Sequence, residues 1–399
     1  RTKFSESRLK LIIKKFKMKF IQNTLLFFIA TILTIILLNL IIVSNSLKIF
    51  DQNFLPRHWA LNSDRYFLTF YPNTHDKTLN NYSAVLGDSI SFGEGDGWVN
   101  YENKYSILHY LKENNKKNYL NFSKPGADSI TSIKEFIFTY DRIGRSIFLP
   151  EIETPNEFIV FFETGDLLAN YNSYILRGKK RSIDKFVTNE ISDFTNYKDR
   201  LFNINFPLVK SSYLVLREKI IHYIYLGFAR KILVKLGLKD PVASFSKKEI
   251  SKEKNKVNKI IINSEKLIFP GIISSPYLLL DEMEANIGIK ILFESILYLK
   301  NNFPDTKIVL VSIPPPSNIY DWVYPIKIQD KSINREKVLN DDTDLKKYRE
   351  IMEKIKIFSK KTNVLFINPL NELKKIGKKE YIHGTRDSKH PSIKGYEYI

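Results

Sequence analysis

The order of apolar and polar positions predicts a protein of the α/β class. Four short apolar runs are rich in β-branched and aromatic residues, as buried strands are, at residues 83–86, 157–162, 307–313 and 364–367. Longer stretches between them, such as residues 286–301, carry apolar side chains at helical spacing. Strands that alternate with helices indicate a parallel sheet.

A longer apolar run covers residues 24–43 and contains no charged residue. A helix of this length spans about 30 Å, which matches the hydrocarbon core of a bilayer. We therefore predict one N-terminal transmembrane helix. A cleavable signal peptide is the alternative, but its apolar region is about 7–15 residues long and precedes small residues. The sequence Ser44-Asn45-Ser46-Leu47 is a poor cleavage site, which favours retention of the helix.

Basic residues set the expected orientation of this helix. Residues 1–20 contain eight Lys or Arg and one Glu, whereas few basic residues follow the span closely. The positive-inside rule then places residues 1–23 in the cytoplasm and the rest of the chain outside. We expect a single-pass protein of the inner (cytoplasmic) membrane, with a tether at 44–79 and a periplasmic or extracellular domain at 80–399. A natural start at Met18 would weaken the charge asymmetry without reversing it.

Composition narrows the classes of function. The net charge of +19 is typical of nucleic-acid-binding proteins, but part of it lies in the basic residues before the apolar run. The sequence has no zinc-finger spacing and no Gly-rich RNA-binding signature, so we expect no nucleic-acid partner. Cysteine is absent, which excludes disulfides, thiolate zinc sites and a cysteine nucleophile.

Residues 170–286 differ from the rest of the exported part and are predicted to form an insertion. They contain a charged stretch at 247–259 and a basic amphipathic segment at 213–236. Such a segment suits either a helix on the membrane surface or a helix that packs its apolar side on the core.

The first candidate for chemistry is Ser89, in the sequence Gly87-Asp88-Ser89 directly after the first apolar run. A serine at a strand-to-helix turn is held above the C-terminal edge of a parallel sheet, where α/β proteins place their sites. Gly87 permits the tight turn. Because Gly-Asp-Ser also occurs in ordinary turns, the triplet needs support from elsewhere in the chain.

That support comes from Asp387 and His390, which are three residues apart near the C-terminus. This spacing lets one loop present a carboxylate to one nitrogen of the imidazole while the other nitrogen faces a nucleophile. Among the six histidines of the chain, His390 is the one that follows an aspartate at this spacing. His383 is the other candidate for this histidine, but we expect it to be a surface or supporting residue.

Together, the two motifs resemble the GDSL/SGNH hydrolase family, whose first and last sequence blocks match Gly87-Asp88-Ser89-Ile90 and Asp387-x-x-His390. The resemblance covers about residues 80–399, with the insertion outside it. It implies a flavodoxin-like three-layer α/β/α fold with a parallel sheet and serine esterase or acyl-transfer chemistry that needs no cofactor or metal. It also implies an oxyanion hole formed by the amides of Ser89 and of Gly126, which lies in a segment similar to the second block.

The third block departs from the family pattern. The family has an asparagine that donates to the oxyanion, whereas Thr164-Gly165-Asp166 places Gly165 at that position. Loss of such a donor typically lowers the rate by about 10²–10³. Asn170, one helical turn later, is the candidate substitute.

Two functions follow from these motifs. The first is an exported, membrane-anchored enzyme that removes or transfers acyl groups, acetyl among them, on an envelope glycan or other ester substrate. The second is a catalytically inactive envelope protein that keeps the fold and binds glycan or a membrane partner. A distance beyond about 5 Å between His390 and Ser89 would favour the second.

Overall fold

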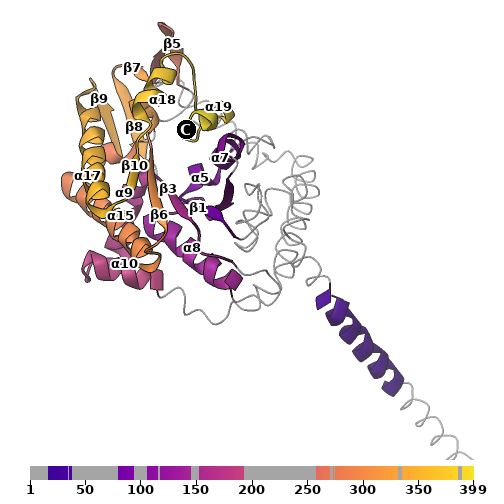
Figure 1. The fold of residues 1–399 in the computed structure, drawn as a ribbon. Coiled ribbons are helices and arrows are strands. Elements are labelled where there is room, and N and C mark those ends of the chain that lie inside the picture. Colours follow the sequence, from indigo (N-terminus) through magenta and orange to yellow (C-terminus); the bar gives the residue numbers. More distant parts are fainter. Residues whose placement is uncertain are drawn as a thin grey trace, which may run out of the picture.

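The computed structural model describes residues 17–34, 36–37, 80–93, 106–115, 117–144, 152–192, 258–269, 273, 275–330, 335–384 and 389–399. Five parallel strands form the central sheet in the order β10-β6-β3-β1-β2 (Figure 1). They are β1 (Tyr82–Leu86), β2 (Asn118–Asn121), β3 (Glu157–Glu163), β6 (Lys307–Ile313) and β10 (Leu365–Ile367). The predicted α/β class with a parallel sheet is confirmed, and four of the five strands lie where the apolar runs predict them.

Side chains along the strands alternate between the two faces of the sheet, so each face has its own hydrophobic core. Ala84, Phe158 and Val160 face one side of the sheet, whereas Val85 and Ile159 face the other. All five are buried. Strands that are covered on both faces read as nearly continuous apolar runs, which explains why the sequence signals them clearly.

Helices cover both faces of the sheet (Figure 1). The larger core holds apolar residues from α8 (Ser129–Gly144), α9 (Thr164–Ser173), α10 (Ile183–Ser192), α15 (Glu282–Asn302) and α17 (Lys346–Thr362). The opposite core includes residues from α7 (Ile107–Asn115) and α19 (Ile393–Tyr398). The other helices after residue 80 in the described part of the chain are short: α5 (Ser89–Phe92), η1 (Tyr174–Gly178), η4 (Pro276–Leu278), α16 (Pro316–Ile319), η5 (Thr343–Leu345) and α18 (Leu370–Gly377).

The longest helix, α15, begins where the sequence provides a complete cap. Asp281 accepts a hydrogen bond from the backbone N–H of Glu284 at 2.7 Å, and Glu284 accepts one from that of Asp281 at 2.9 Å. This reciprocal pair satisfies two backbone donors that a helix start otherwise leaves unpaired. On its buried side, Gly288 lets α15 approach α9, because a Cβ at this position would lie 2.4 Å from the carbonyl oxygen of Leu167.

Antiparallel strands lie beside the parallel sheet. One sheet has the order β5-β4-β7, from β4 (Lys259–Ile262), β5 (Glu265–Ile268) and β7 (Asp321–Val323). A hairpin pairs β8 (Ile326–Asp330) with β9 (Arg335–Leu339). Within the predicted insertion, α10 packs on α15, and β4 and β5 join the antiparallel sheet. The charged and amphipathic segments predicted at 247–259 and 213–236 lie outside the described residues, except the final two of the former.

The N-terminal region is described only as a helix at residues 17–34 and at 36–37. Its large apolar side chains are exposed, and Phe20 and Phe27 are 68% and 69% exposed. No helix among the described residues is both long and apolar enough to cross a membrane. Residues 35 and 38–43 of the predicted span and the tether at 44–79 lie outside the described part, so the membrane anchor stays a prediction.

Candidate active site

The turn between β1 and α5 positions Ser89. Gly87 has a φ of +151°, and a Cβ there would lie 2.2 Å from Ser91 Oγ and 2.9 Å from the carbonyl oxygen of Phe161. Only glycine fits this crowded turn. The carboxylate of Asp88 then caps α5 by accepting a hydrogen bond from Ile90 N at 2.9 Å. Ser89 is therefore the first residue of a helix that starts at the carboxyl end of a central strand.

His390 reaches Ser89 from the far end of the chain. Its Nε2 lies 2.8 Å from Ser89 Oγ, although the two residues are 301 positions apart. Both residues are buried. Asp88 Oδ2 is a second acceptor for the Ser89 hydroxyl, but at 3.5 Å it is a weaker one. The shorter contact is within the range expected for a nucleophile and its general base.

The third predicted member of the triad, Asp387, lies in residues 385–388, outside the described residues. Its role as the partner of His390 stays a prediction. Among the described groups, the carboxylate of Asp88 interacts electrostatically with His390.

Gly126 lies in a turn after β2 and has a φ of +70°. The segment before it runs beside the Ser89 turn, because Phe122 N donates to Val85 O at 2.8 Å and Lys124 N donates to Gly87 O at 3.0 Å. The segment that contains Gly126 therefore lies next to the turn that carries Ser89. The backbone amide of Gly126 remains the predicted second oxyanion donor.

Asn170 has a different role from the one we expected. Its amide nitrogen donates to Ser129 Oγ at 3.0 Å and to Gly288 O at 3.1 Å, and its oxygen accepts from Ser129 N at 3.0 Å. Asn170 is fully buried between α8, α9 and α15. Since both amide hydrogens are engaged, Asn170 has none left for an oxyanion in this structure. It ties three helices together instead.

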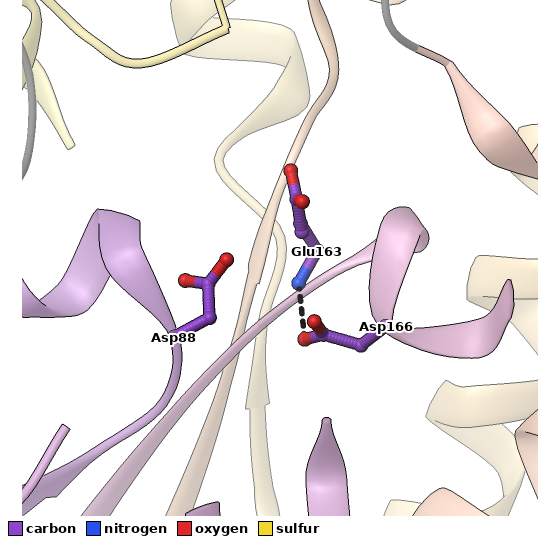
Figure 2. A group of neighbouring side chains, drawn as sticks. All are labelled: Asp88, Glu163 and Asp166. Carbon is purple, nitrogen blue, oxygen red and sulfur yellow. Dashed lines mark hydrogen bonds between the residues drawn. The ribbon is translucent and has the colours of Figure 1, made fainter. Parts of the chain in front are cut away.

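Sequence reasoning missed a cluster of three carboxylates at and near the Ser89 turn. Side-chain oxygens of Asp88, Glu163 and Asp166 lie within 4.8 Å of one another (Figure 2). Asp166 Oδ2 accepts a hydrogen bond from the backbone N–H of Glu163 at 3.0 Å. The residues come from the carboxyl ends of two adjacent strands, β1 and β3, and this adjacency was the signal that could have revealed the cluster.

Lys389 supplies positive charge to this cluster. Its Nζ lies 3.5 Å from Glu163 Oε1. The same Glu163 oxygen would lie 2.7 Å from a Cβ at Gly165. The Glu163 side chain therefore takes the space that a larger residue at position 165 would need. Gly165 thus leaves room for the Glu163 side chain that pairs with Lys389.

Burial and charge shift the pKa values of these groups. Burial raises the pKa of Asp88 to about 6, and the charge of Glu163 adds to the rise. Burial, followed by the charges of Asp88 and Glu163, raises the pKa of Asp166 well above its usual range. The charge of Glu163 raises the pKa of Lys389, which stays protonated. Asp88 and Asp166 therefore keep their protons to a higher pH than exposed aspartates do.

Within the described part of the chain, these three carboxylates are the group close enough together to hold a metal ion. Lys389 already brings a cation to Glu163. We assign no metal to the cluster.

A small hollow lies beside the cluster. Apolar side chains line most of it, among them Ile90, Ile313 and Pro391, and Glu163 and Lys389 supply charge at its wall. Its free space, about 10 Å³, corresponds to about one water molecule.

His383 also lines this hollow, and it is not a surface residue as one of our two expectations had it. It is 4% exposed, and its Nδ1 lies 2.7 Å from the hydroxyl of Tyr320. The sequence around His383 does not reveal its contact with Tyr320, because the two residues are 63 positions apart.

A scan of the sequence against models of known protein families gives no match, and a search among curated proteins finds no relative. The geometry around Ser89 therefore carries the functional argument.

Proposed function

We propose that this chain is a serine esterase or O-acyltransferase of the GDSL/SGNH type, with Ser89 as nucleophile and His390 as general base. The single observation that carries the proposal is the 2.8 Å contact between His390 Nε2 and Ser89 Oγ. The strand order β2-β1-β3-β6-β10 supports it, since flavodoxin-like sheets have the corresponding order 2-1-3-4-5. In such sheets, ligands bind where the order reverses, which here is between β1 and β3.

The proposed reaction has two halves. In the first, the Ser89 hydroxyl gives its proton to His390 Nε2 while Oγ attacks the ester carbonyl carbon. The ester C–O bond then breaks, and the leaving alcohol takes the proton from His390. In the second, water or a sugar hydroxyl gives a proton to His390 and attacks the acyl-enzyme, and the proton returns to Ser89. Asp387 orients the imidazole, and amides of Ser89 and Gly126 stabilise the oxyanion.

Acetyl is the acyl group that we propose. The apolar run at residues 24–43 supports an enzyme anchored in the inner membrane, single-pass, with the domain at 80–399 periplasmic or extracellular. An envelope glycan that carries acyl esters would be within reach there.

The test is hydrolysis of p-nitrophenyl acetate by the detergent-solubilised chain. We expect activity in the unchanged chain and its loss in Ser89→Ala. Ser91→Ala is a matched control, because Ser91 is also a buried serine of α5 and its Oγ donates to the carbonyl oxygen of Asp88 rather than facing His390. Equal rates in the unchanged chain and in Ser89→Ala would exclude Ser89 as the nucleophile. An acylated glycan acceptor assay then separates transferase from esterase.

The catalytically inactive alternative is disfavoured by the same contact. A non-catalytic protein has no need to hold an imidazole nitrogen 2.8 Å from a serine hydroxyl at the end of a central strand.

A further inference from the structure

Tyr320 lies close to the segment that leads to His390. It directly follows α16, which begins three residues beyond the end of β6, and it is 2% exposed. Its ring packs against those of Phe269, Trp322, Tyr381 and His383. This packing fixes the ring, so the position of the hydroxyl is fixed as well.

The hydroxyl of Tyr320 makes two hydrogen bonds to the same short segment. It accepts from the backbone N–H of Ile382 at 3.0 Å and lies 2.7 Å from Nδ1 of His383. The phenol O–H can then donate to Nδ1, and we assign the bond in this direction, with Nδ1 as the acceptor. Burial raises the pKa of Tyr320, so the hydroxyl keeps the hydrogen that this bond needs.

The segment that Tyr320 holds is paired with the backbone of His390. His383 and Pro391 form an antiparallel bridge. Gly384 N donates to His390 O at 2.9 Å, and Ser392 N donates to Ile382 O at 2.9 Å. Two backbone bonds thus connect residues 382–384 to residues 390–392, one on each side of the bridge.

We propose that Tyr320 is a positioning residue for His390. Its hydroxyl bonds to Ile382 and His383 and fixes their position. The bridge between His383 and Pro391 in turn fixes the backbone of His390, whose Nε2 lies 2.8 Å from Ser89 Oγ. Tyr320 acts through the backbone and does not contact the reacting atoms. A general base that is displaced by about 1 Å loses about 10²-fold in rate, so a single distant hydroxyl can control the reaction. This inference rests on the proposed function of the Ser89–His390 pair.

The experiment compares two buried tyrosines of the same core in the full chain. Tyr320→Phe removes the two bonds to residues 382–383 and keeps the ring. Tyr277→Phe is the matched control, because its hydroxyl is equally buried but donates to Asn318 Oδ1 at 2.7 Å. For each chain, kcat and KM are measured with p-nitrophenyl acetate, and hydrogen exchange is measured at the amides of Gly384 and Ser392.

For Tyr320→Phe, we expect kcat to fall about 10–100-fold with KM within about twofold, and both amides to exchange at least about tenfold faster. Tyr277→Phe should leave kcat and both exchange rates near those of the unchanged chain. The proposal is overturned if Tyr320→Phe keeps the original kcat and exchange rates. It is equally overturned if Tyr277→Phe lowers kcat by the same factor.

A second pair of variants covers the case in which Tyr320→Phe does not fold. In His383→Asn, the amide oxygen replaces Nδ1 as an acceptor, whereas His383→Leu removes the acceptor. We expect His383→Asn to keep most of the kcat that His383→Leu loses, and equal kcat values in the two would contradict the proposal. If the unchanged chain shows no Ser89-dependent hydrolysis, the proposed function fails, while amide exchange in these variants still decides the role of Tyr320.

Discussion

The two halves of the Ser89–His390 pair are held in different ways. Ser89 is placed by its sequence neighbours, through the crowded turn at Gly87 and the cap from Asp88 to Ile90. His390 is placed by distant residues, through a bridge to residues 382–384 and the Tyr320 hydroxyl beyond it. The proposed nucleophile, which lies on a local turn, can therefore be recognised from a short motif. The position of the proposed base depends on tertiary bonds within the C-terminal region.

The largest expected effect comes from removing either half. Ser89→Ala and His390→Ala should each lower kcat for p-nitrophenyl acetate by about 10⁴-fold or more. Because the two groups act as one unit, the double variant should be no slower than either single variant. Losses that multiply in the double variant would show that the residues act independently.

The next largest effect tests the local turn that positions Ser89. Gly87→Ala should lower the free energy of unfolding by about 4 kcal/mol, since the new Cβ meets Ser91 Oγ and the carbonyl oxygen of Phe161 and the φ is strained. Gly126→Ala is the control, because its φ is also positive but a Cβ there meets nothing within 4 Å. It should cost only about 1 kcal/mol. Urea unfolding of the solubilised chains measures both, and similar losses would mean that crowding at Gly87 does not matter.

A pH dependence follows from Asp88. Its pKa in the folded chain is raised to about 6 from 3.8, so this group contributes stability below about pH 4 that is lost as the pH rises through about 6. Asp88→Asn keeps an acceptor for Ile90 N and removes the charge. We expect the unfolding free energy of the variant minus that of the unchanged chain to rise by about 2–3 kcal/mol as the pH rises from 4 to 7. A difference that does not change with pH would contradict the assigned shift.

The smallest effect tests the long-range contacts that position His390. Ser392 caps α19 by accepting from Gly395 N at 3.1 Å, and its hydroxyl also donates to Ile382 O at 3.1 Å. Ser392→Ala should lower the unfolding free energy by about 1 kcal/mol. Since the backbone bond from Ser392 N to Ile382 O remains, kcat should stay within about threefold. Ser192→Ala, at the end of α10, is the control and should have little effect on either quantity.

The sequence predicted the parts of the fold that depend on local patterns. The apolar runs located β1, β3, β6 and β10, because strands buried on both faces are continuous in apolar residues. It did not predict β2, whose residues Asn118–Asn121 begin and end with asparagine, nor the antiparallel strands β4 and β5 inside the predicted insertion.

The site was predictable to a similar degree. Ser89 and His390 were found from two motifs, and the structure brings them together. The expectation that Asn170 donates to the oxyanion did not account for its bonds to Ser129 and Gly288, which come from other helices. The ion pair of Glu163 with Lys389 joins residues more than 200 positions apart, and no local pattern reveals such a contact.

The most direct test of the Ser89–His390 pair is labelling of the solubilised chain with a fluorophosphonate, followed by peptide mass spectrometry. We predict that the label is found on Ser89 and that His390→Ala abolishes it although Ser89 is still present. No label on Ser89, or labelling that persists unchanged in His390→Ala, would contradict the conclusion that His390 activates Ser89.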